Sequence, residues 1–221
     1  MNPAFSKGLR PGLYAITDEQ LIPADQLVAA VTAALRGGAV LVQYRDKRSP
    51  DSVRLDQASR LQGLCGEAGV PLIINDDPQL AKRVGAAGVH LGQSDRTLAD
   101  ARNLLGEDAL IGITCHGDLE LARLAHDQGA DYLAFGRFFQ SATKPGAPPA
   151  NRQVLAQARQ FGRPTTAIGG ITVHNGADLI TSGADLLAVV GGLFGPGDVE
   201  LRARQFSRLF ADHHPLYPFH P

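Results

Sequence analysis

Residues 37–47 read GGAVLVQYRDK, and this stretch shows the unit on which a prediction of the fold rests. Its two glycines suit a helix end, because glycine readily adopts the left-handed conformation that closes a helix. The apolar run that follows is continuous rather than alternating, which is typical of a parallel strand buried on both faces. Polar residues take over at Gln43. The stretch therefore predicts a helix end, a buried strand and a polar strand end in succession.

The same unit recurs along the chain. Glycine-containing helix ends precede apolar runs at 69–71, 87–89, 129–131 and 183–185, with amphipathic stretches between the runs. We expect strands near Leu13–Ile16, Val40–Gln43, Leu72–Ile74, Val89–Leu91, Leu110–Ile113, Tyr132–Phe135, Thr165–Ile168 and Leu186–Val190. We expect helices near Asp25–Arg36, Asp51–Glu67, Leu80–Val84, Leu98–Leu105, Asp118–Asp127, Arg152–Gln160, Val173–Ile180 and Val199–Phe210.

Eight strand–helix pairs in 221 residues predict a single α/β domain, a (β/α)8 TIM barrel over residues 1–212. An open doubly wound sheet is the alternative, but it would more often carry a dinucleotide glycine fingerprint after its first strand. Residues 17–20 read TDEQ and carry no such fingerprint. Residues 213–221 are expected to be an irregular His/Pro-rich tail. The three histidines after Phe210 could bind metal, although a solvated tail is the preferred interpretation.

The composition restricts the class of protein. Hydrophobic residues make up 44% of the chain, enough for a large core, and 21 basic against 22 acidic residues give a net charge of −1. This balance does not suit a nucleic-acid binder. No apolar run approaches a membrane span, and residues 1–12 do not resemble a signal peptide. Two cysteines form no disulfide framework, so we expect a cytoplasmic protein. Barrels of this sort often form homo-oligomers, but no interface signature decides it here.

Polar residues gather just after the predicted strands. In such a barrel the chemistry lies at the carboxyl ends of the strands. The polar segments there are Gln43–Lys47, Asn75–Asp77, Gly92–Asp95, Thr114–His116, 136–146, Gly169–Gly170 and Gly191–Gly192. This mouth of the barrel is therefore the predicted site.

Gln43, Arg45 and Lys47 alternate, so in an extended chain they project to one side. Two cations and an amide suit a multiply charged anion, which Arg can bind through two oxygens. An exposed strand end with ordinary solvated charges is the alternative, and it stays open.

Asp76 and Asp95 follow neighbouring strands. Two carboxylates suit Mg²⁺, which keeps waters and takes oxygens from substrate phosphates. Helix capping is the alternative, because Asp77 and Asp95 could each cap the next helix; for Asp76 and Asp95 a metal is the preferred interpretation. For Asp77, which precedes Pro78, a cap is the preferred interpretation.

Two further segments suit phosphorylated ligands. The glycine pairs after the seventh and eighth strands stand where barrels usually bind phosphate. Tight turns would also explain them. Residues 137–151 form an unusually long loop that holds Lys144, one of only four lysines, and it suits a lid over a phosphorylated substrate. A flexible insertion is the alternative.

Taken together, these motifs resemble thiamine-phosphate synthase from about Gly12 to Phe194. The matching pieces are QYRDK at 43–47, NDD at 75–77, GVHLGQ at 88–93 with Asp95, GITCH at 112–116, SATK at 141–144 and AIGGI at 167–171. Each piece is short, but six pieces in order at strand ends are specific.

The resemblance implies roles for individual residues. The pyrimidine diphosphate would be held by Gln43, Tyr44, Arg45, Asp46, Lys47, Asn75, Thr114 and Lys144, with Arg45, Lys47 and Lys144 catalytic. The thiazole phosphate would be held by Ser141, Ala142, Thr143, Gly169, Gly170, Val190 and Gly191. Asp76 and Asp95 would carry Mg²⁺. The family commonly has serine where this chain has Thr114, which keeps the hydroxyl. The family often has serine where this chain has Gly191, so one side-chain hydrogen bond is lost there and we expect weaker thiazole-phosphate binding.

The family's reaction is understood as dissociative, and it needs charge neutralised on a leaving diphosphate rather than a protein nucleophile. Cys115 and His116 are adjacent on a strand and should face opposite ways, which disfavours a Cys–His nucleophile. Three rivals remain. A related thiazole tautomerase would not need the Asp76/Asp95 pair, and a Schiff-base aldolase would want a lysine within a strand. A non-catalytic binding paralogue would bind ligand without turnover.

Overall fold

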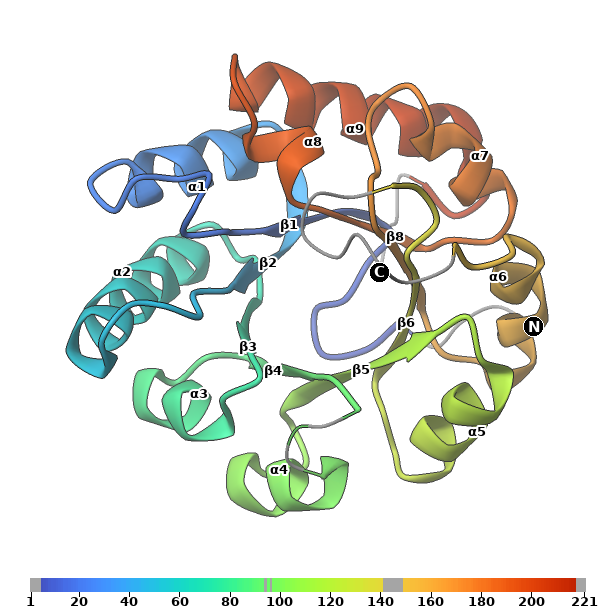
Figure 1. Ribbon diagram of the computed structural model, residues 1–221, viewed down its shortest axis with the longest axis horizontal. Coiled ribbons are helices and arrows are strands. Elements are labelled where there is room, and N and C mark those ends of the chain that lie inside the picture. Colours follow the sequence, from blue (N-terminus) through green and yellow to red (C-terminus); the bar gives the residue numbers. More distant parts are fainter. Residues whose placement is uncertain (1–4, 94, 96, 141–148, 218–221) are drawn as a thin grey trace.

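The computed structural model describes residues 5–93, 95, 97–140 and 149–217. Eight parallel strands close into a barrel in the order β1 to β8, and helices surround it (Figure 1). The strands are β1 Gly12–Ile16, β2 Ala39–Tyr44, β3 Leu72–Asn75, β4 Gly88–Leu91, β5 Leu110–His116, β6 Tyr132–Gly136, β7 Thr165–Ile168 and β8 Leu186–Val189. The predicted barrel is confirmed, and the open sheet is excluded.

The helices follow the prediction closely: the eight expected helices are present, and their ends lie within three residues of the predicted ones. They are α1 Leu27–Arg36, α2 Asp51–Glu67, α3 Pro78–Val84, α4 Leu98–Leu105, α5 Leu119–Asp127, α6 Gln153–Ala158, α7 Gly176–Thr181, α8 Gly191–Phe194 and α9 Val199–His213. A 3₁₀ turn, η1 Arg159–Phe161, ends the α6 region. Helix α8 was not predicted, because four residues that begin with two glycines carry no helical periodicity. Helix α9 runs three residues past its predicted end.

The glycine helix ends are confirmed at most positions. Gly38, Gly69, Gly129 and Gly183 each have a positive φ, one to three residues before the next strand begins. The interpretation of Gly88 was wrong, because it lies within β4, where a Cβ would overlap the carbonyl of Leu110. Helix α3 is closed instead by Gly85, with φ +66.

The core has two parts, one between strands and helices and one inside the barrel. Inside the barrel, Tyr14, Leu41, Ile73 and Tyr132 are at most 1% exposed. Truncating a buried side chain of this size to Ala typically costs about 2–5 kcal/mol. The strands that carry the site therefore start from a tightly packed lumen.

Two Gly-Ala-Asp sequences, at 129–131 and 183–185, stabilise the amino-terminal end of the barrel through their aspartates. Asp131 Oδ2 accepts a hydrogen bond from the Ile111 backbone N–H, and Asp185 Oδ2 accepts one from Thr165, both at 2.8 Å. Lys7 pairs with the other Asp131 oxygen at 2.8 Å, and His214 Nε2 lies 3.1 Å from Asp185 Oδ1. The expectation of a solvated, irregular tail from 213 was wrong for two residues, because His213 is helical and His214 is buried. His220 lies outside the described residues.

Within the described ranges, no helix combines the length and apolar character needed to cross a bilayer.

Candidate active site

The strand ends bring most of the predicted polar residues to one mouth of the barrel. Parallel register sets Ile73 beside Gln43, and His90 beside both Asn75 and Gly112. Asn75 ends β3, and Thr114 lies near the end of β5. The pairing of neighbouring strands therefore builds the site from residues far apart in sequence.

The alternating residues Gln43, Arg45 and Lys47 reach different partners. Gln43 is 2% exposed and donates to the Tyr14 hydroxyl inside the barrel at 2.6 Å. Arg45 Nη1 lies 2.7 Å from Asp18 Oδ2, beyond β1. Lys47 Nζ lies 2.8 Å from Asp76 Oδ2, beyond β3. The solvated alternative does not describe Gln43 or Arg45, because both hold specific protein partners.

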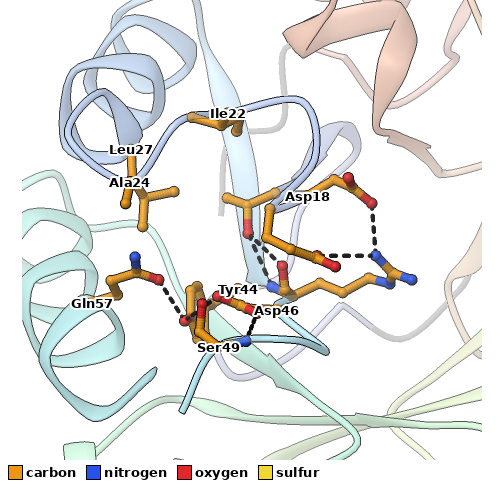
Figure 2. Close-up of a pocket in the computed structure, with 11 residues that line it drawn as sticks. Asp18, Ile22, Ala24, Leu27, Tyr44, Asp46, Ser49 and Gln57 are labelled. Atoms are coloured by element: carbon orange, nitrogen blue, oxygen red, sulfur yellow. Dashed lines mark hydrogen bonds and ion pairs between the residues drawn. The ribbon is translucent and has the colours of Figure 1, made fainter. Parts of the chain in front are cut away.

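Tyr44 and Asp46 lie on the other side of the chain from Gln43. Figure 2 shows them in a pocket that residues of α1 and α2 also line, with Tyr44 facing Gln57. The Tyr44 hydroxyl donates to Gln57 Oε1 at 2.7 Å, and burial together with Asp46 raises its pKa. Asp46 Oδ1 accepts the backbone N–H groups of Arg48 and Ser49, each at 2.9 Å. Both side chains therefore shape the loop that presents Arg45 and Lys47.

Asp76 and Asp95 meet at the mouth, as expected from neighbouring strands. Their carboxyl groups are close enough to share a hydrogen bond, and Asp95 also accepts the Gly92 N–H at 2.6 Å. Burial and the Asp76 charge raise the pKa of Asp95. Burial also acts to raise the pKa of Asp76, but Lys47 and Asp95 outweigh it and lower that pKa. Asp76 is therefore the more acidic of the two carboxyl groups.

Asp76 has a further unusual feature: its φ is +60. A left-handed backbone at a residue other than glycine is uncommon and tends to occur at functional sites. Such a pair suits Mg²⁺, which takes one or two carboxylates together with substrate oxygens and water. Among the described residues there is no group of three or more His, Cys, Asp or Glu placed to hold a metal alone.

Of the two aspartates that were predicted as possible helix caps, Asp77 and Asp95, only Asp77 caps a helix. Asp77 caps α3, because its Oδ1 accepts the Leu80 N–H at 2.9 Å, and this prediction is confirmed. Helix α4 is capped by Thr97 rather than by Asp95.

Three of the four glycines in these two pairs lie where a Cβ would not fit. Gly169 and Gly170 have φ values of +101 and +65, and a Cβ on either would overlap residues 137–140. A Cβ at Gly192 would overlap the Ile171 carbonyl, whereas at Gly191 it would meet only Leu21, at 3.9 Å. Val190 precedes α8, so the first-turn N–H groups of that helix open toward the end of β8.

Ser141, Ala142, Thr143 and Lys144 lie outside the described residues. Cys115 is fully buried, and burial raises the pKa of its thiol to about 12, while neighbouring His116 is exposed. A thiol in that state is a poor nucleophile. The prediction against a Cys–His nucleophile therefore agrees with the structure.

Three polar residues of the lumen were not predicted as site residues: Tyr14, His90 and Tyr132. The Tyr132 hydroxyl lies 2.9 Å from that of Tyr14 and 3.0 Å from His90 Nδ1. His90 Nε2 lies 2.9 Å from Thr114 Oγ1. The available signal was a histidine at an inward position of an otherwise apolar strand.

Comparisons with known proteins agree with the fold and the motifs. Residues 13–193 match the family model described as thiamine monophosphate synthase. A thiamine-phosphate synthase of Marinobacter nauticus is 66% identical over 211 residues, which cover 95% of each chain. A solved thiamine phosphate pyrophosphorylase of Pyrococcus furiosus matches with a TM-score of 0.83 and 30% identity, over 91% of this chain and 96% of that one. A 3-hexulose-6-phosphate synthase of Salmonella typhimurium, 18% identical with a TM-score of 0.67 over 92% and 100%, shows the fold alone.

The fold and these relatives define a (β/α)8-barrel enzyme of the transferase class. The chain belongs to the thiamine monophosphate synthase family.

Proposed function

We propose that the chain joins 4-amino-2-methyl-5-(diphosphooxymethyl)pyrimidine to 4-methyl-5-(2-phosphooxyethyl)thiazole, or to its carboxylated form. The products would be thiamine monophosphate and pyrophosphate, together with CO₂ when the carboxylated thiazole is the substrate, as a step of thiamine biosynthesis. The observation that carries the proposal is the cluster in which Lys47 joins Asp76 and Asp95 within the same mouth as Gln43 and Arg45.

The substitution breaks the bond between the pyrimidine methylene and the diphosphate oxygen, and the diphosphate keeps the electron pair. The lone pair of the thiazole nitrogen then forms the new carbon–nitrogen bond. No proton has to be removed in this exchange, so no protein base is required. What the site must provide is stabilisation of charge on the leaving group.

Arg45, Lys47 and Lys144 provide that positive charge in this proposal. Lys47 is 55% exposed, so exchanging its Asp76 partner for a phosphate oxygen costs little. Asp76 and Asp95 would hold Mg²⁺, which when bound neutralises charge on diphosphate oxygens. Gln43, Asn75 and Thr114 bind and orient the pyrimidine diphosphate.

The thiazole phosphate is assigned to the other half of the mouth. The backbone at Gly169–Gly170 and at Val190–Gly191 offers N–H donors, which suit a phosphate. Ser141, Ala142 and Thr143 complete this part of the proposal on the resemblance alone.

A substrate-omission assay tests the proposed function. The chain is incubated with Mg²⁺ and each substrate singly, then with both, and thiamine monophosphate and pyrophosphate are quantified. We expect both products in equal amounts only when both substrates are present. Isomerisation of a thiazole carboxylate phosphate without condensation would instead identify the tautomerase.

A further inference from the structure

A continuous chain of hydrogen bonds crosses the barrel lumen. It runs from Gln43 through Tyr14, Tyr132 and His90 to Thr114, with contacts of 2.6, 2.9, 3.0 and 2.9 Å. These five residues come from five strands, and the two tyrosines are at most 1% exposed. Both ends of the chain are residues assigned to the pyrimidine diphosphate, whereas the three central residues have no assigned role.

The chain has one direction. Gln43 Nε2 donates to the Tyr14 oxygen, so the single Tyr14 proton points to Tyr132. The Tyr132 proton then points to His90 Nδ1, which accepts it. In a neutral ring this leaves the His90 proton on Nε2, from which it is donated to Thr114 Oγ1, 2.9 Å away. The Thr114 hydroxyl proton is left to donate elsewhere, and the Gln43 carbonyl oxygen is left to accept.

Gly112 makes room for this arrangement. It pairs with Tyr132 across β5 and β6, and a Cβ on Gly112 would overlap the Tyr132 ring. The ring therefore lies over Gly112 and stacks on His90, with centroids 5.6 Å apart and an interplanar angle of 22°. The glycine belongs to the same local sequence as Thr114, so the gap and the end of the chain come from one strand.

We propose that Tyr14 and Tyr132 are positioning residues that fix Gln43 as an acceptor and Thr114 as a donor toward the pyrimidine diphosphate. This inference rests on the proposed function. An acceptor at Gln43 suits the amino group of an aminopyrimidine, and a donor at Thr114 suits a phosphate oxygen. The reverse direction would set amide hydrogens against amino hydrogens.

Two single-hydroxyl variants test the proposal. Tyr14→Phe removes the partner of Gln43, and Tyr132→Phe breaks the chain at its centre while keeping the ring over Gly112. We expect each to raise KM for the pyrimidine diphosphate about tenfold, the effect of roughly one hydrogen bond, with an unchanged KM for the thiazole phosphate. Thr165→Val is the control. It also removes a fully buried hydroxyl, but at the amino-terminal end of β7, away from the mouth of the barrel.

Equal shifts in both KM values, or the same shift in Thr165→Val, would show that the tyrosines only pack the lumen. A second comparison separates positioning from packing. In a Gln43→Leu background, Tyr14→Phe should add no further loss of affinity for the pyrimidine diphosphate, measured by calorimetry. An additive loss would contradict action through Gln43.

The ¹⁵N chemical shifts of the His90 ring nitrogens report the direction of the hydrogen-bond chain without any substrate. We expect a protonated Nε2 and an unprotonated Nδ1 in the native protein, and loss of this fixed pattern in Tyr132→Phe. A protonated Nδ1 in the native chain would overturn the proposal. If the native protein made no product, the proposed function would be overturned. The protonation pattern of His90 would still decide the direction of the hydrogen-bond chain.

Discussion

Lys47 Nζ lies 2.8 Å from Asp76 Oδ2, so a predicted anion-binding residue and a predicted metal ligand form one ion pair. An ion pair as exposed as this one contributes at most about 1 kcal/mol. The pair therefore keeps both groups in place at the mouth and yields easily to stronger partners. A bound diphosphate would pair with Lys47 and a bound divalent cation with Asp76, so the ion pair between them would break.

Asp76→Asn and Asp95→Asn should each lower kcat by about 100-fold or more and raise the Mg²⁺ concentration needed for half-maximal activity. The reason is that each change removes an anionic ligand from a set of two. Steady-state rates across a Mg²⁺ titration measure both effects. Asp77→Asn is the matched control, because asparagine caps a helix as well as aspartate does and Asp77 holds α3 rather than the site. Equal losses in all three variants would contradict the metal assignment.

Lys144→Ala should reduce kcat far more than Cys115→Ala. A lysine that neutralises the leaving diphosphate acts in the transition state, so its loss should cost about 100-fold. Cys115 is buried and uncharged, so its truncation should lower the free energy of unfolding with little change in kcat. Rates normalised to folded protein make the comparison. Equal losses of kcat would overturn the assignment of Lys144.

Gly191→Ser should lower KM for the thiazole phosphate by about threefold to tenfold, the range expected for one added hydrogen bond. The site has room, because a Cβ there meets only Leu21 at 3.9 Å. Gly192→Ser is the contrasting variant and should destabilise the fold, since its Cβ would overlap the Ile171 carbonyl. Finding no gain in KM for Gly191→Ser would show that the glycine does not weaken binding.

Asp46 should contribute to stability at neutral pH but not in acid. Burial acts to raise its pKa, but hydrogen bonds from Ser49 and Arg48 outweigh burial and lower it in the folded state. A depressed folded pKa gives stability above the unfolded value, which is about 3.9, and that stability is lost as pH falls through the folded pKa. Urea unfolding of the native chain and of Asp46→Ala should therefore differ more at pH 7 than at pH 2.5. A gap that widens in acid would contradict this origin.

Much of the fold could be predicted, because the signals are local. The ends of α2 and α4 were placed correctly by amphipathic patterning and flanking residues, and the eight continuous apolar runs are the eight strands. Helix α8 could not be predicted from four residues. Gly88 looked like the other helix-end glycines, and only contact with Leu110 in the next strand distinguishes it.

The site was predicted less completely, because its geometry depends on pairing between strands. The position of Asp76 beside Asp95 followed from neighbouring strand ends. The contact of Tyr14 with Tyr132 joins residues 118 positions apart, and no local pattern indicates it. Alternation suggested that Gln43, Arg45 and Lys47 act together, yet their partners come from different elements, namely Tyr14, Asp18 and Asp76.

The metal dependence of condensation tests most directly whether the chain joins the two substrates with a metal held by Asp76 and Asp95. Purified chain is given both substrates with Mg²⁺, then with excess EDTA, then with Mg²⁺ restored, and thiamine monophosphate is measured at each stage. We expect product with Mg²⁺, none with EDTA, and recovery when the metal returns. Undiminished product in EDTA would contradict the metal role of Asp76 and Asp95, and no product from folded protein at any stage would contradict the proposed function.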